Sequence, residues 1–169
     1  MNYQKSVIDL IKTRKSSRTY DNRAIESSKL KNLSEYLVLL NSEAKIKARF
    51  AVVSSEDLGS NSGKKLGTYG VITGASTYVV GILDKEEKNS PAFGYLFEKI
   101  ILKACDLELQ TCWLGGTFKK SDFEKAISLK ENEQIVMVSP IGYRKEKNEK
   151  SCYLIMTTKR NIYKSDDIA

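Results

Sequence analysis

Four short runs rich in apolar and β-branched residues recur along the chain, and longer segments with helical periodicity separate them. Strands are predicted at residues 50–53, 77–83, 110–114 and 134–143. Helices are predicted over residues 1–13, from Ser27 or Ser28 as cap to Asn41, from a Ser90 cap and Pro91 to Leu107, and from a Ser121/Glu124 capping box to Leu129. Because long helices intervene, strands that are neighbours in the sheet need not be neighbours in sequence. The pattern predicts one α+β domain over residues 1–169, with four strands covered by four or more helices.

Composition limits the chemistry that this chain can perform. The 169 residues contain no histidine, which excludes histidine-based triads and histidine-ligated metals. Three cysteines (Cys105, Cys112 and Cys152) form no CxxC pair, so neither a zinc site nor a disulfide framework is indicated, and reduced thiols are expected. An enzyme of this composition has to use carboxylates, lysine, tyrosine, cysteine or a cofactor.

Charge and hydropathy indicate the class of partner. A net charge of +7 favours anionic partners such as nucleotides, phosphates or nucleic acid. No apolar run reaches the roughly 18 residues that a membrane span needs, and the N-terminus does not resemble a signal peptide. A cytoplasmic protein that does not contact membranes is therefore expected.

The segment Arg14–Tyr20, RKSSRTY, places cations, hydroxyls and a phenol directly after the first predicted helix. Arginine, lysine and hydroxyl groups all give hydrogen bonds to phosphate oxygens, and the cations strengthen them by charge. The segment is therefore either a phosphate-binding site or a solvated turn after a helix, and the pattern alone does not decide between them.

A second informative segment ends the third predicted strand. Trp113, Leu114, Gly115 and Gly116 offer a flat apolar side chain next to backbone that a planar ligand can approach closely. A tight turn beside a core tryptophan would give the same pattern, so both interpretations stay open.

Three segments in order resemble the FMN-dependent nitroreductase family: IKTRKSSRTYDNRAIE near the N-terminus, EKIILKACDLELQTCWLGG in the middle and EQIVMVSPIGYRKE near residue 140. The resemblance covers most of residues 5–145. It implies the nitroreductase fold, with a mainly antiparallel central sheet, and a homodimer with FMN at the subunit interface. It also implies an oxidoreductase that passes a hydride from NADH or NADPH through FMN to a nitroaromatic, quinone or similar small acceptor, by a ping-pong mechanism.

The resemblance also implies roles for individual residues. Arg14, Lys15, Ser16 and Arg18 would hold the FMN phosphate and the polar edge of the flavin. Leu114, Gly115 and Gly116 would lie against the flavin ring, and Trp113 would pack that wall. Lys159 and Arg160 are the candidates for the phosphate contact that the family makes from its C-terminal arm, here about residues 145–169. No residue is assigned as a catalytic acid or base, and no metal ligand is expected.

The chain departs from the family pattern in three places. The family often has an asparagine where this chain has Thr68 or Tyr69, its Gly-Leu-Gly turn is replaced by Leu107-Glu108-Leu109, and 169 residues is short. These departures leave open an alternative function, an FMN-binding storage or sensing protein with little turnover. A nucleic-acid-binding module is a third hypothesis, but no groove-reading helix or stacking-aromatic motif accompanies the positive charge. Neither the acceptor nor the choice of NADH or NADPH follows from the sequence.

Overall fold

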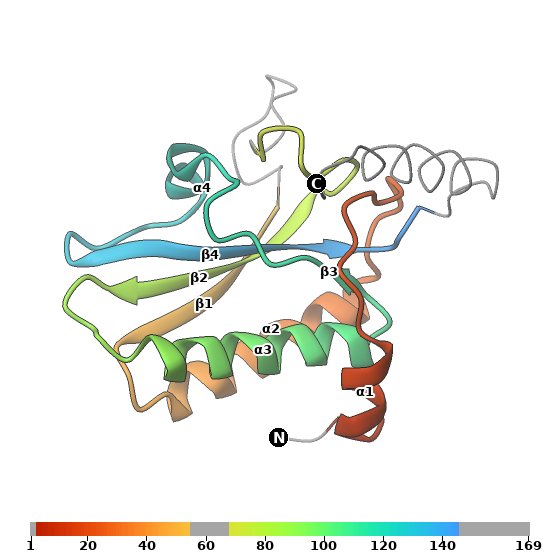
Figure 1. Cartoon of the computed structure of the whole chain (residues 1–169), viewed down its shortest axis with the longest axis horizontal. Coiled ribbons are helices and arrows are strands. Elements are labelled where there is room, and N and C mark those ends of the chain that lie inside the picture. Colours follow the sequence, from red (N-terminus) through yellow and green to blue (C-terminus); the bar gives the residue numbers. More distant parts are fainter. Residues whose placement is uncertain (1–2, 55–67, 146–169) are drawn as a thin grey trace, which may run out of the picture.

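The computed structural model describes residues 3–54 and 68–145. Its elements are α1 (Val7–Thr13), α2 (Ser27–Glu43), β1 (Ala48–Ser54), β2 (Thr77–Asp84), α3 (Ser90–Asp106), β3 (Gln110–Thr111), α4 (Lys120–Ala126) and β4 (Glu133–Gly142). All four predicted strands and all four predicted helices are present, which confirms the α+β class (Figure 1).

The strands form one antiparallel sheet in the order β1-β2-β4-β3. Strand β2 lies between β1 and β4, and each of its residues from Tyr78 to Asp84 is buried. Its neighbour β4 is separated from it in sequence by α3, β3 and α4, as the long intervening segments led us to expect. The sheet therefore brings the end of β4 next to β3 and to the chain that follows α1.

Helices cover both faces of the sheet. The long helices α2 and α3 lie side by side on one face, and α4 lies on the other (Figure 1). Successive side chains of β2 point to opposite faces of the sheet. Val79 therefore lies in the core under α2 and α3, and Val80 lies in the core under α4. At Gly81 a Cβ atom would lie 2.6 Å from the Phe93 ring, so glycine allows α3 to pack closely on the sheet.

The predicted start was wrong for every helix: α1 begins at Val7 rather than at residue 1, and the caps predicted for α2, α3 and α4 are one or two residues too late. Helix α2 begins at Ser27 with Glu26 as its cap residue, and neither helix α2 nor α4 has a side-chain cap hydrogen bond. The α3 cap is Asn89 rather than Ser90, because its Oδ1 accepts from the Ala92 N–H at 3.1 Å. Helix α4 ends at Ala126, three residues before the predicted Leu129. Ser90, which follows the Asn89 cap, is the first residue of α3.

Strand β3 is shorter than predicted for a specific reason. Its ladder with β4 covers Gln110 and Thr111 only, and pairing resumes at Leu114 opposite Val138. Between them the Cys112 N–H donates to the Ser139 hydroxyl at 3.2 Å instead of to a strand carbonyl. A side-chain acceptor thus replaces the ladder for one residue.

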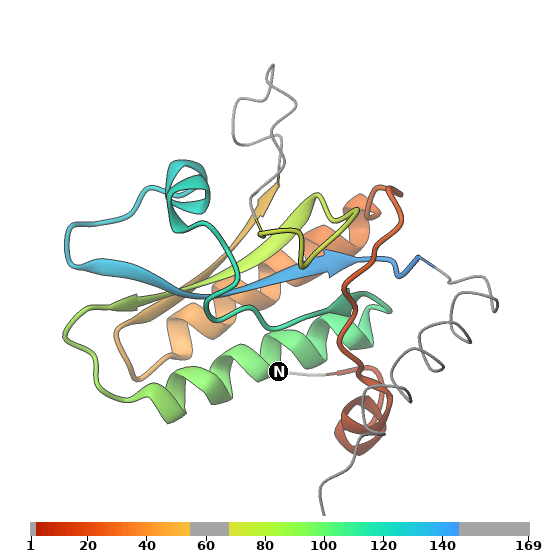
Figure 2. The same cartoon turned by 45° about the horizontal axis from the view of Figure 1, so that its top comes forward.

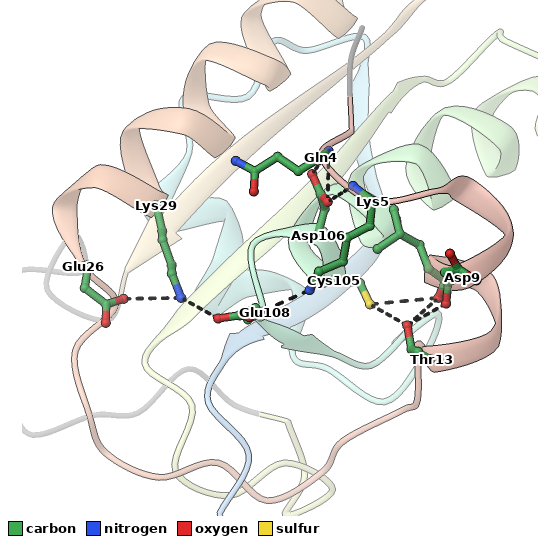
Figure 3. Close-up of polar contacts among 10 residues, drawn as sticks. Gln4, Lys5, Asp9, Thr13, Glu26, Lys29, Cys105, Asp106 and Glu108 are labelled. Carbon is green, nitrogen blue, oxygen red and sulfur yellow. Dashed lines mark hydrogen bonds and ion pairs between the residues drawn. The ribbon is translucent and has the colours of Figure 1, made fainter.

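The chain before α1 is anchored to the end of α3 by Asp106 (Figure 3). The buried Asp106 carboxylate accepts the backbone N–H groups of Gln4 (2.9 Å) and Lys5 (3.0 Å) and lies 3.6 Å from the Lys103 amine. Helix α1 itself buries Leu10, whereas Val7, Ile8 and Ile11 are 43%, 62% and 59% exposed. The apolar side chains of α1 are therefore only partly packed, and the contacts of Asp106 hold the chain that enters the helix.

Candidate functional site

The segment Arg14–Tyr20 runs alongside β3, which places the two informative sequence segments next to each other. Ser16 forms a parallel bridge with Thr111, and the Ser17 N–H donates to the Thr111 carbonyl at 2.9 Å. Both views of the chain show this segment passing the end of the sheet after it leaves α1 (Figure 2). Residues far apart in sequence are thereby joined by backbone hydrogen bonds.

The loop before β2 holds the other side of the same segment. The Tyr20 N–H donates to the Thr73 carbonyl at 2.8 Å, and the Thr73 N–H donates to the Arg18 carbonyl at 2.9 Å. At Gly74 the backbone φ is +83°, and a Cβ atom there would lie 2.1 Å from the Tyr20 carbonyl oxygen. Only glycine fits this approach, so Gly74 has a structural role in holding the Arg14–Tyr20 segment.

A polar cavity of about 180 Å³ opens where this segment meets the end of β4. It is lined by Ser16, Ser17, Arg18, Thr19, Arg144 and Lys145. Three cations and three hydroxyl-bearing residues line the cavity, and no carboxylate is among them. The Lys145 N–H donates to the Thr19 carbonyl at 3.1 Å and so fixes the two walls relative to each other. This lining is suited to an anion with several oxygens.

Of the four residues expected to hold the FMN phosphate and the flavin edge, two line the cavity and two do not. Ser16 and Arg18 line it. The Arg14 Nε lies 3.6 Å from a Glu98 carboxylate oxygen on α3, away from the cavity lining. Lys15 is exposed. Arg144 and Lys145 also line the cavity. They were not predicted as site residues, although this basic pair directly follows the last predicted strand, residues 134–143.

The segment Trp113–Gly116 divides into an anchored half and an open half. The half-buried Trp113 ring packs edge-on against Phe97, with ring centroids 4.8 Å apart, and its Nε1 donates to Glu98 at 3.0 Å. Leu114 is buried, and its N–H and carbonyl both pair with Val138. Gly115 and Gly116 are exposed, and a Cβ at Gly116 would meet nothing within 4 Å. A ligand approaching here would meet the glycine backbone rather than the Leu114 N–H.

These two features fit the two ends of FMN. The cavity supplies cations and hydroxyls for a phosphate monoester, and the exposed glycines leave room for a flat ring against backbone. The two features are close together along the chain. Thr111 pairs with Ser16 at the cavity, and Leu114, directly before the glycines, lies three residues further on, about 10 Å along an extended chain. The cavity alone is too small for the whole cofactor, so the ring would lie outside it, over Gly115 and Gly116.

Two tyrosines beside the site have hydroxyl groups in contrasting surroundings. Burial raises the pKa of Tyr20, whose hydroxyl lies in the core with no hydrogen-bond partner among the described residues. The Tyr143 hydroxyl donates to Glu26 and lowers the pKa of that carboxyl. The Arg23 guanidinium lies 3.6 Å over the Tyr143 ring. Neither tyrosine is arranged as a proton donor to the cavity.

Several predictions fall outside the described residues or concern other positions. Lys159, Arg160 and Cys152 lie outside them. Cys105 and Cys112 are free thiols. Thr68, at the position where the family often has asparagine, is buried and its hydroxyl donates to the Ile72 carbonyl at 3.4 Å, whereas Tyr69 is 70% exposed.

Within residues 3–54 and 68–145, no helix has both the length and the apolar character needed to cross a bilayer.

Comparison with solved structures places the fold among the nitroreductases. A nitroreductase family protein from Clostridium novyi NT is 21% identical with a TM-score of 0.62, covering 84% of this chain and 87% of its own. An FMN-dependent nitroreductase from Clostridium difficile R20291 is 22% identical with a TM-score of 0.61, covering 83% and 89%. A mutant of the FMN and NADPH-dependent nitroreductase NfnB from sphigopyxis sp. strain HMH is 12% identical with a TM-score of 0.64, covering 85% and 90%.

Comparison with protein families gives the same assignment over almost the whole chain. A search of curated protein sequences found no match. The family model described as "Putative TM nitroreductase" matches residues 6–167. The expected fold and family are therefore both confirmed, and the chain belongs to this nitroreductase family.

Proposed function

We propose that this protein is an FMN-dependent oxidoreductase that transfers a hydride from NADH or NADPH to a nitroaromatic, quinone or similar small acceptor. One observation carries the proposal: the cavity lined by Ser16, Arg18, Arg144 and Lys145 lies at the junction of β3, β4 and the segment after α1. The described FMN dependence of the Clostridium difficile and NfnB proteins supports FMN as the cofactor.

The cavity would bind the FMN phosphate. Ser16 and Arg18 come from one wall, and Arg144 and Lys145 come from the other. The three cations would more than offset the two negative charges of the phosphate, and their hydrogen bonds to it would be strengthened by charge. Lys15, which is exposed, and Lys159 and Arg160 remain proposed contacts, the last two from the arm at about residues 145–169.

The flavin ring would lie on Gly115 and Gly116, with Trp113 and Leu114 supporting that wall from behind. When bound, FMN supplies the hydride-transfer chemistry itself, which a chain without histidine does not need to provide. The protein would orient the ring, offer backbone N–H groups at the glycines and place the Arg14 guanidinium nearby. No side chain is assigned as a proton donor.

The surroundings of the site suggest how it would be completed. Gly115 and Gly116 are exposed, so a ring lying on them needs a cover to exclude water. We propose that a second copy of this single domain supplies the cover, in a cytoplasmic homodimer with FMN at the interface. Reductant and acceptor would then occupy the same space in turn, which gives a ping-pong pattern.

A steady-state assay tests the proposal. Purified protein supplied with FMN should oxidise NADH or NADPH when a quinone or a nitroaromatic compound is added. Parallel double-reciprocal lines would support the ping-pong order. Bound FMN that neither nucleotide reduces would favour a storage or sensing role instead, and a chain that binds no FMN would contradict both.

A further inference from the structure

Glu98 on α3 connects the two segments of the proposed flavin site through a single side chain. One carboxylate oxygen accepts the Trp113 indole N–H at 3.0 Å, and the other lies 3.6 Å from the Arg14 Nε. Trp113 comes directly before the Leu-Gly-Gly wall, and Arg14 begins the cationic segment. The site residues predicted from the sequence did not include Glu98.

The contact with Trp113 is directional and partly shielded from solvent. The indole is held at its nitrogen by Glu98 and along its ring by the adjacent Phe97, whose plane lies at 76° to it. Consecutive residues of one helix thus fix both the position and the rotation of the ring. Because the backbone of Trp113 leads into Leu114 and the glycines, a fixed indole also fixes where the wall begins.

The contact with Arg14 leaves most of the guanidinium available. Glu98 approaches the Nε side, and the two terminal nitrogen atoms of an arginine carry four further N–H donors. The Arg14 and Glu98 side chains are 29% and 39% exposed, so neither is sealed in the core. An arginine held at Nε presents its terminal fork in one direction, which lowers the entropy lost when the fork binds an anionic or carbonyl group.

We propose that Glu98 is a positioning residue that orients Arg14 and Trp113 together for the flavin, an inference that rests on the proposed function. One of its oxygens accepts the Trp113 N–H, and the other forms the ion pair with Arg14. Glutamine retains one acceptor oxygen and no charge, and alanine retains neither. The Glu98→Gln variant should therefore keep one contact and lose the other, whereas Glu98→Ala should lose both.

The chain offers a built-in spectroscopic probe because Trp113 is its only tryptophan. Its emission can be followed in the protein without FMN, and FMN binding can be followed by quenching of flavin fluorescence. Glu35→Gln is the matched control, because Glu35 is 67% exposed on α2 and forms only a loose 4.0 Å ion pair with Lys31. Thermal unfolding of each variant separates a local effect from a general loss of structure.

We expect Glu98→Ala to shift the Trp113 emission to longer wavelength and to weaken FMN binding by about two- to fivefold, the range of a half-exposed ion pair. The same substitution in an Arg14→Gln background should change FMN affinity less, because only the contact with Trp113 is then left to lose. Glu35→Gln should match the wild type in both readouts. A melting temperature close to that of the wild type is expected for all variants.

Three results would overturn the inference. Unchanged emission and FMN affinity in both Glu98 variants would show that the contacts do not position the site. An equal loss of FMN affinity with and without Arg14 would show that Glu98 does not orient Arg14, so that its role is not a joint one. A wild-type chain that binds no FMN would overturn the proposed function and this inference with it, whereas the first two results leave the proposed function intact.

Discussion

The Ser17 N–H donates to the Thr111 carbonyl at 2.9 Å, and this bond joins the cationic segment after α1 to the strand that leads into Trp113–Gly116. Neither Arg14–Tyr20 nor Trp113–Gly116 could be interpreted alone. The pairing brings the two segments together, so they can contribute to one site. A solvated turn after a helix would not need to pair with a strand. The cations of this segment are therefore placed on a fixed backbone at the sheet edge, where they can bind a ligand with little loss of order.

Replacing Arg18 with glutamine should weaken FMN binding about tenfold, which is ~1.4 kcal/mol. Arg18 lines the 180 Å³ cavity, and its substitution removes one of the three cations there. Isothermal titration with FMN measures the change. Lys31→Gln is the control, since Lys31 is 78% exposed on α2 and its substitution removes the same charge from the surface. Equal affinities for the two variants would contradict the assignment of the phosphate to this cavity.

Replacing Glu108 with glycine should stabilise the protein by about 0.5–1 kcal/mol. Glu108 follows α3 with φ +64°, a backbone conformation that glycine adopts without strain. Its ion pairs with Lys5 and Lys29 are both 3.8 Å long, and its side chain is 71% exposed, so their loss should cost less. Urea unfolding of Glu108→Gly and Glu108→Ala measures the effect, because alanine loses the same ion pairs and keeps the strain. A glycine variant no more stable than the alanine variant would show that the turn carries no strain.

Replacing Tyr20 with phenylalanine should leave stability unchanged or raise it by up to ~1 kcal/mol. The ring is only 2% exposed and its hydroxyl has no hydrogen-bond partner among the described residues, so the substitution removes a desolvated group. Tyr78→Phe is a matched comparison in the same core, because the Tyr78 hydroxyl donates to the Ala75 carbonyl at 3.3 Å. That variant should lose about 1 kcal/mol in the free energy of unfolding. A Tyr20→Phe variant that loses as much as Tyr78→Phe would indicate a partner for the Tyr20 hydroxyl.

Stability should fall in acid through the ion pair of Arg49 with Glu133. Arg49 donates two hydrogen bonds to Glu133, at 2.8 and 2.7 Å, and lowers the pKa of Glu133 from 4.5 to about 2. A carboxyl whose pKa is lowered in the folded state stabilises the protein at pH values above the pKa of the unfolded chain, 4.5. This contribution disappears as the pH falls toward about 2.

The contribution is about 1 kcal/mol, since the arginine is one-third exposed. Urea unfolding across this pH range should show a shallower loss of stability for Glu133→Gln than for the wild type. Parallel curves for the two proteins would show that other carboxyls cause the acid sensitivity.

The fold was largely predictable because its signals are local. The period of Leu33, Leu37 and Leu40 identifies α2, and the β-branched run of β2 identifies a strand that is buried on both faces. The errors fall where a contact distant in sequence decides the outcome. Strand β3 stops at Thr111 because the Ser139 hydroxyl accepts the next N–H, and no local pattern reports that contact.

The site was predictable in part. The hydroxyl and cation pattern allowed an anion site that includes Ser16 and Arg18, and both residues line the cavity. That the anion is the FMN phosphate stays a prediction, which the family resemblance implies. The sheet order, which the sequence leaves open, brings Arg144 and Lys145 to the same cavity. Glu98 gave no signal at all, because a glutamate on an amphipathic helix is usually a solvent-exposed residue.

The most direct test of the central claim, that this chain binds FMN and uses it, is the visible absorbance spectrum of the purified protein after incubation with FMN and removal of free cofactor. We expect flavin bands that remain with the protein and bleach when NADH or NADPH is added anaerobically. Bands retained by the wild type and lost in a variant lacking both Arg18 and Arg144 would place the cofactor at the cavity. A colourless wild-type protein after the same treatment would show that this chain does not bind FMN.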